Sequence, residues 1–145
     1  MKLSDIEKNA QAFFESGFNC AESISQAILE AFAEEGPKDI PRVTSAFGGG
    51  VGGSHEGVCG AFTGGVIAIG YLLGRIRPTE NVDAAKAIAA EFQKRYKKRY
   101  GTTNCGELLD KFGPQVNHHQ CRDMVGKTAV ELARVLRNHG VKMKR

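Results

Sequence analysis

The sequence predicts an all-α fold, a single compact bundle of about five to seven helices. Apolar residues recur at helical spacing along most of the chain, and Gly or Gly-Pro signals separate these stretches. No stretch shows the strict alternation that predicts a strand. At 145 residues, 41% of them hydrophobic, the chain is long enough to bury a core, so we expect one domain over residues 1–145.

Two helices are predicted before the middle of the chain. Ser4 begins a capping-box pattern, and apolar side chains then follow at helical spacing until Gly17, which predicts a first helix. Asn19 is a suitable N-cap with an acidic residue three positions later. A second helix is therefore expected to begin at Cys20 and to end near Gly36.

The middle of the chain predicts a long connection followed by two longer helices. Residues 37–57 hold one short helical stretch, 40–47, and then a glycine-rich loop. Residues 58–73 are apolar on nearly all sides, which indicates a central, buried helix directly after this loop. Thr79 is expected to cap a further helix that runs to Tyr100, where a glycine stops it.

Two more helices are predicted at the C-terminal end. Asn-Cys-Gly-Glu repeats the capping pattern of the second helix, so a short helix should begin at Cys105 and end at Phe112, before the Gly-Pro at 113–114. After a polar loop, Cys121 is expected to open the last helix, which reaches about Asn138.

Charge and hydropathy exclude several function classes. The net charge of +4 is too small to indicate nucleic-acid binding, and the basic end of the helix before Tyr100 is explained by the helix dipole. The run 58–73 is interrupted by glycines and shorter than the roughly 20 residues of a membrane span. Residues 1–7 carry acids where a signal peptide has its apolar core, so we expect a cytoplasmic protein. Structural disulfides are rare there, which directs attention to metal or redox roles for the four cysteines.

Each cysteine falls at the start of a predicted helix: Cys20, Cys59, Cys105 and Cys121. Helix N-termini carry partial positive charge, which stabilises the thiolate that attacks disulfides and binds metals. If the helices alternate in direction and the long 37–57 connection returns the chain, all four thiols lie at one end of the bundle.

The spacing leaves several kinds of site open. There is no C-x-x-C motif, so neither a thioredoxin-like pair nor a zinc ribbon is indicated. Four thiols that meet in space are the donors of an iron–sulfur cluster or of a tetrahedral metal. Three histidines near cysteines, His55, His118 and His119, are either bases or ligands or simply polar loop residues. The glycine loop lacks the lysine and the preceding strand of a nucleotide-binding motif.

The cysteine order carries a family resemblance. Cys20 is followed by Gly57-Val58-Cys59-Gly60-Ala61-Phe62-Thr63-Gly64-Gly65, then by Cys105 and Cys121, and this order resembles the C_GCAxxG_C_C family of redox-active proteins. The resemblance implies a small, mostly helical protein with four signature cysteines, redox activity and no firm substrate. Similar segments occur in split-Soret cytochromes beside an iron–sulfur centre and haem. This chain has no haem-attachment motif, so only the cluster carries over.

We therefore expect Cys20, Cys59, Cys105 and Cys121 to form one redox site that serves an unidentified redox partner or small molecule. The site is either a [2Fe–2S] electron-transfer centre, which we favour, or a dithiol/disulfide exchange centre with Cys59 as nucleophile. Three glycines are expected to shape it: Gly57, Gly60 and Gly64. The alternatives are a non-redox module for zinc or a soft metal and a structural protein with inert thiols. The glycine-marked central helix suits a monomer core or a homodimer interface.

Overall fold

The computed structural model describes residues 1–144, and within them it contains seven α-helices, one short 3-10 helix and no strand. This confirms the all-α prediction. The elements in chain order are α1 (Leu3–Glu15), α2 (Cys20–Phe32), α3 (Ile40–Thr44), η1 (Ser45–Phe47), α4 (Gly60–Leu73), α5 (Asp83–Tyr100), α6 (Cys105–Phe112) and α7 (His119–Asn138). None of these helices is both long and apolar enough to cross a membrane.

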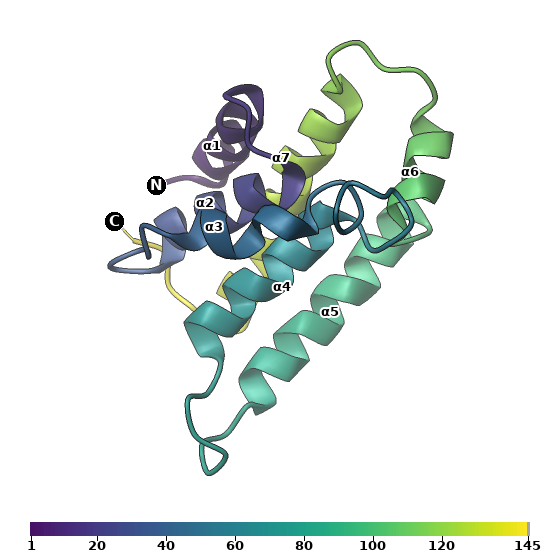
Figure 1. Cartoon of the computed structure of the whole chain (residues 1–145). Coiled ribbons are helices and arrows are strands. Elements are labelled where there is room, and N and C mark those ends of the chain that lie inside the picture. The colour runs from purple at the N-terminus through teal and green to yellow at the C-terminus, as the bar shows by residue number, and fades with distance from the viewer. Residues whose placement is uncertain (145) are drawn as a thin grey trace.

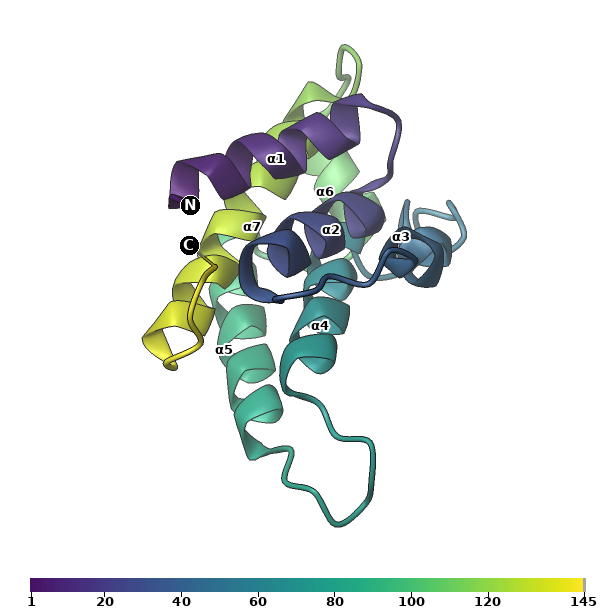
Figure 2. The same cartoon turned by 90° about the vertical axis from the view of Figure 1, so that its left-hand side faces the viewer.

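Helix α2 is the centre of the bundle. It contacts α1, α3, α4 and α7, while α1 also lies along α7 (Figure 1, Figure 2). Helices α4 and α5 run side by side, and the loop that joins them extends away from the rest of the molecule in both views. The short helix α6 follows α5 and lies beside the glycine-rich connection (Figure 1).

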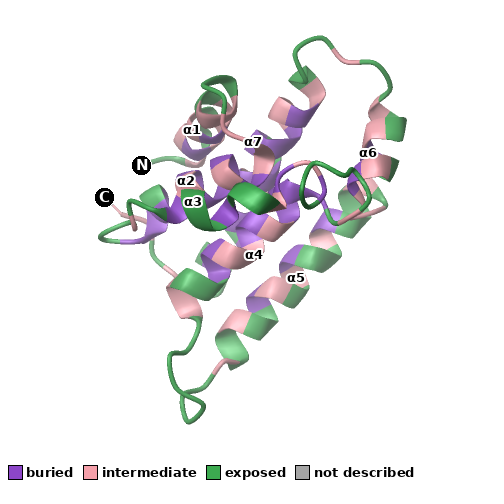
Figure 3. Ribbon diagram, in the orientation of Figure 1, coloured by how far each residue is buried: buried purple, intermediate pink, exposed green. Residues whose placement is uncertain are grey.

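The core differs from the expectation at α4. Its N-terminal half is buried against α2, but its C-terminal end is not covered, and Tyr71 is 50% exposed (Figure 3). The apolar composition of 58–73 predicted a helix buried along its whole length. That prediction was wrong for the last turn, where Gly70 and Tyr71 are exposed and Leu72 and Leu73 are only partly buried against the core.

Two predicted helix starts also shift. Val58 lies outside α4, because it forms an isolated antiparallel bridge with Asn104 instead of a helical turn. Thr79 does not cap α5. That helix begins at Asp83, whose backbone N–H donates to Asn81 Oδ1 at 2.7 Å. The turn before α5 is held instead by Glu80, whose side-chain oxygen accepts from the backbone N–H groups of Ile76 and Arg77.

The remaining boundaries move by a few residues. α1 begins at Leu3 rather than at Ser4, and α2 ends at Phe32, before Gly36. α7 begins at His119, so Cys121 is its third residue instead of its first. Each cysteine still lies at the N-cap or in the first turn of a helix.

The glycine-rich connection is an ordered left-handed turn. Five successive residues, 49–53, have φ between 63° and 72°. Glycine adopts this region freely, but the turn also includes Val51, a β-branched residue that favours it poorly. Backbone hydrogen bonds close the turn, from His55 N to Gly49 O at 2.8 Å and from Gly57 N to Gly50 O at 2.9 Å. The turn returns the chain to the start of α4.

Candidate functional site

The starts of α4 and α6 are bonded directly to each other. The backbone N–H of Cys59 donates to Thr103 O at 2.6 Å, and that of Cys105 donates to Gly57 O at 2.9 Å. Val58 and Asn104, which directly precede these two cysteines, form an isolated antiparallel bridge with each other. Two cysteines far apart in the sequence are thereby held side by side by the backbone, independently of their side chains.

Matching asparagine caps position two of the four cysteines. Asn19 Oδ1 accepts from Glu22 N at 2.9 Å, and Asn104 Oδ1 accepts from Glu107 N at 3.0 Å, as the repeated sequence pattern predicts. Each asparagine also donates from Nδ2 to a backbone carbonyl of the connection between α2 and α4, at 3.0 Å and 2.8 Å. The caps therefore fix the cysteine-bearing helix starts both to their own helices and to the loop.

Glycines let α4 approach α2 closely. A Cβ at Gly60 would lie 3.0 Å from Ala21 N and 3.2 Å from Cys20 Cβ, and a Cβ at Gly64 would clash with the carbonyl oxygen of Ala21. Only glycine fits both positions without a shift of the helices. This close approach brings the start of α4, and with it Cys59, next to Cys20.

Glycines of the connection between α2 and α4 let that connection approach the start of α6 closely. A Cβ at Gly50 would lie 2.5 Å from Cys105 Cβ, and a Cβ at Gly57 would lie 2.6 Å from Gly50 O. On the helix side, a Cβ at Gly106 would lie 2.6 Å from His55 O. The left-handed turn is thus pressed against the start of α6. Of the three glycines expected to shape the site, all lie in such close contacts.

Cys121 is held by Gln115, a residue that the sequence did not single out. Gln115 Oε1 accepts from the backbone N–H groups of Gln120 and Cys121 at 2.9 Å and 3.1 Å, and its Nε2 donates to Cys121 Sγ at 3.4 Å. The amide thus replaces a side-chain N-cap, which His118 does not provide. No local pattern marks a glutamine six residues before a cysteine as its partner.

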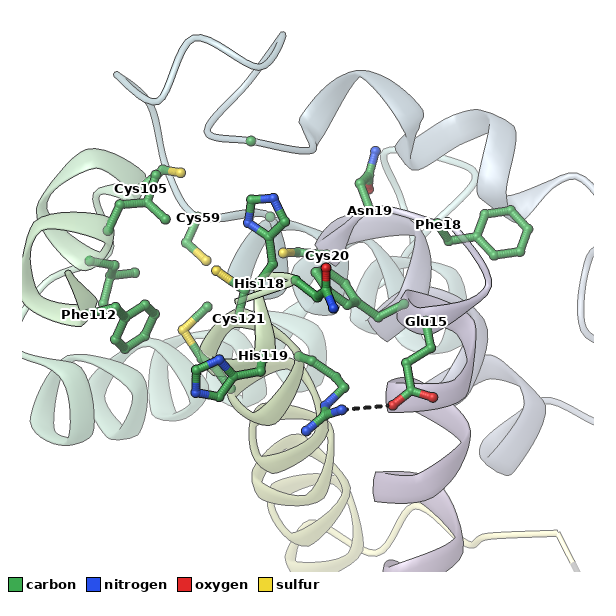
Figure 4. A pocket seen from close by; sticks show the side chains of 18 of the residues that line it. Glu15, Phe18, Asn19, Cys20, Cys59, Cys105, Phe112, His118, His119 and Cys121 are labelled. Carbon is green, nitrogen blue, oxygen red and sulfur yellow. Dashed lines mark hydrogen bonds and ion pairs between the residues drawn. The ribbon is translucent and has the colours of Figure 1, made fainter. Parts of the chain in front are cut away.

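All four cysteines line a single pocket of about 1220 Å³, which confirms that they lie at one end of the bundle (Figure 4). The sulfurs of Cys20, Cys59 and Cys121 point toward a common space, with Cys105 on the α6 side (Figure 4). The three predicted histidines also line this pocket. All four cysteines are free thiols.

Burial makes these thiols weak acids. Burial raises the pKa of Cys20 well above its ordinary value, and the charges of Cys59, Cys121 and Cys105 raise it further. Burial likewise raises the pKa values of Cys59 and Cys121, and burial together with the other thiols raises that of Cys105 to about 11. The lowering expected at helix N-termini is therefore outweighed by desolvation. Near neutral pH the site holds protonated thiols.

Cys59 lies beside groups that lower its thiol pKa and so oppose the effect of burial. Burial raises its pKa, but hydrogen bonds from the Tyr96 hydroxyl and from the backbone N–H groups of Ala61 and Phe62 lower it. Tyr96 is itself buried, and in the structure its hydroxyl donates to Met124 Sδ at 3.6 Å, so it can donate to Cys59 only by turning from Met124. No local pattern in the sequence marks this tyrosine of α5 as a neighbour of Cys59.

The four cysteine thiols are suitable metal ligands by their chemistry, but their positions in the structure do not form a metal site. Four thiols are the usual ligand set of iron–sulfur clusters, and a cation would relieve their mutual repulsion. In the part of the chain that the structure describes, however, no three His, Cys, Asp or Glu residues are arranged to hold a metal ion. A metal ion would therefore require these thiols to move closer together, and a disulfide, with its S–S bond of about 2 Å, would require a still closer approach of two of them.

Comparison with known proteins gives one match. A family model described as "Putative redox-active protein (C_GCAxxG_C_C)" matches residues 18–135, a span that contains all four cysteines. No curated protein and no solved structure matches the chain.

Proposed function

Because the chain belongs to the C_GCAxxG_C_C family of redox-active proteins, we propose that its four cysteines work as one redox centre. The observation that carries this proposal is the convergence of four thiols, from four different helix starts, on one pocket. Buried thiols that only fill a core need no such convergence. The proposed centre consists of Cys20, Cys59, Cys105 and Cys121.

The form that we propose first is reversible dithiol/disulfide chemistry. All four thiols are free, and all four line the same pocket. Cys59 is the proposed nucleophile, because backbone N–H groups favour its thiolate and its charge raises the pKa values of Cys20 and Cys105. A neighbouring cysteine then completes the disulfide.

An iron–sulfur cluster is the second candidate, and the donor set favours it. Burial and the mutual repulsion of the four thiolates raise the thiol pKa values, and the positive charge of the iron ions in a cluster would offset that repulsion. The same four cysteines would ligate it, and the cluster would supply one-electron transfer. Sequence reasoning favoured this form, with [2Fe–2S] as the expected type.

One anaerobic preparation separates these forms. Iron, sulfide and zinc are measured, and free thiols are counted before and after mild oxidation. Metal-free protein that loses thiols in pairs and regains them on reduction supports exchange. Brown protein with about two iron atoms and sulfide per chain supports a cluster. Stoichiometric zinc, or thiols that neither bind metal nor pair, would refute a redox centre.

Substitution of the central cysteine tests the same proposal. Cys59→Ser should abolish reversible thiol pairing, or metal content where metal is found, because Cys59 interacts with each of the other thiols. Thiol titration and metal analysis provide the measurement. Ala61→Ser is the matched control, since it also buries a hydroxyl near the start of α4 but keeps all four thiols. Unchanged redox behaviour in Cys59→Ser would remove Cys59 from the centre.

A further inference from the structure

We propose that the cysteine pocket binds a planar, uncharged aromatic electron acceptor of the quinone class beside the thiols. Its binding follows from the pocket itself, and its reduction rests on the proposed redox role of the cysteines. Four features of the pocket support this binding: its size, its walls, its charge and its uncommitted polar side chains.

The pocket is larger than the thiols require. Its volume of about 1220 Å³ exceeds the roughly 300–1,000 Å³ typical of sites for organic molecules. The cysteines form only part of the lining, and the rest comes from the turn between α1 and α2, from α6 and from the loop before α7. A whole organic molecule therefore has room beside the four thiols.

Much of the wall away from the cysteines is apolar, and part of it is aromatic. Phe14 and Phe18 come from the α1–α2 side, and Leu109 and Phe112 come from α6. Figure 4 shows Phe112 on the α6 side and the ring of Phe18 on the opposite side, directed away from the cysteines. These side chains are only half-buried, so apolar surface faces the pocket from both sides. Val116 adds an apolar side chain that is 75% exposed. Aromatic walls favour a flat aromatic molecule, because ring faces stack and apolar area is buried.

The lining offers no unpaired carboxylate or guanidinium. Its one carboxylate, that of Glu15, and its one guanidinium, that of Arg122, are bonded to each other at 3.0 Å (Figure 4). Arg122 also pairs with Asp123 at 3.3 Å. A charged ligand would have to break this pairing or remain unpaired in a largely apolar site, which is unfavourable. An uncharged molecule meets neither cost.

Three polar side chains in the lining are uncommitted. His55, Asn117 and His118 line the exposed part of the pocket, and their side chains make no hydrogen bond within the described residues. All three have left-handed backbones, with φ of 62°, 51° and 54°, and only one other non-glycine residue of the described chain has positive φ. Such conformations cost energy and gather at ligand sites. These groups suit the two carbonyl oxygens of a quinone.

The reaction balances without a further reactant. Two cysteine S–H bonds break and one S–S bond forms between the two sulfurs. The two electrons and two protons that the thiols lose pass to the quinone, whose carbonyl oxygens become hydroxyl groups. A hydroquinone leaves and a disulfide remains in the protein.

Binding and electron transfer are tested separately. The binding probe is tetramethylhydroquinone, measured anaerobically by ligand-observed NMR, because the reduced form cannot oxidise the thiols. The electron acceptor is tetramethyl-1,4-benzoquinone, whose ring has no free position for thiol addition. Hydroquinone formed and thiols lost are counted in wild-type protein and in two variants. Val116→Glu introduces a charge into the pocket, and Ile76→Glu introduces the same charge at a residue 94% exposed in the α4–α5 loop.

We expect wild-type protein to bind the hydroquinone and to lose two thiols for each quinone reduced. Val116→Glu should weaken binding at least about tenfold, and Ile76→Glu by less than about twofold. Absent binding, or equal weakening by both variants, would overturn the inference and leave the redox centre standing. Binding that depends on Val116 while the thiols stay reduced would instead overturn the acceptor role and the exchange mechanism together.

Discussion

The two ends of α4 carry the same residue type in opposite roles. At the cysteine end, Gly60 and Gly64 lie against the backbone of α2, where any side chain would collide. At the other end, Gly70 has no atom within 4 Å of where a Cβ would be. The first pair lets two thiol-bearing helix starts meet, whereas Gly70 only weakens its helix. The role of a glycine in α4 therefore depends on which neighbouring atoms approach it.

The two ends of α4 also differ in how far a thiol there would be exposed to solvent. At the cysteine end burial raises the pKa of every thiol. At the α4–α5 loop, Ile76 is 94% exposed. A thiol there would keep its ordinary acidity, so the two ends provide a buried and a solvated reference within one chain.

The pH dependence of thiol reactivity should show the largest difference between the ends. Because the pKa of Cys105 is raised to about 11, its thiolate is scarce near neutral pH. Its alkylation rate should therefore rise about tenfold per pH unit from about pH 7 to pH 10. The rates are measured by mass spectrometry of the labelled peptides.

The same chain supplies the control for that measurement. Ile76→Cys places a thiol at the exposed loop, and its rate should level off above about pH 9, near the ordinary thiol pKa. Parallel pH profiles for Cys105 and the introduced thiol would contradict the buried character of the site.

Gly64→Ala should damage the cysteine end most. Its Cβ would collide with the Ala21 carbonyl and lie 2.7 Å from Ile24 Cγ2, so α4 and α2 must separate. We expect a loss of about 2–3 kcal/mol in the free energy of unfolding, measured by urea denaturation, together with impaired thiol pairing. A loss below about 0.5 kcal/mol would show that the two helices do not need this close contact.

Gly70→Ala should have the smallest effect and the opposite sign. The new methyl group meets open space, and alanine is the better helix former, so the free energy of unfolding should rise by about 0.5–1 kcal/mol. The same urea titration measures it. Destabilisation would mean that the exposed end of α4 contacts something, such as a second copy of the chain.

Sequence reasoning succeeded where signals act over a few residues. Asn19 and Asn104 were recognised as caps because each bonds the N–H three positions later, and the stops at Gly101 and Gly113 were recognised for similar local reasons. It failed at Thr79, because the turn there is held by a glutamate and the helix begins later.

Local signals in the sequence were enough to predict the helices, the position of each cysteine at or near a helix start and the family motif, because caps, stops and periodicity are local properties. Which glycines admit a neighbouring helix, how Gln115 reaches the sulfur of Cys121, how Tyr96 comes to lie near Cys59 and that burial raises the thiol pKa values depend on the tertiary structure. These features depend on desolvation and on contacts between segments far apart in the chain, which no local pattern specifies.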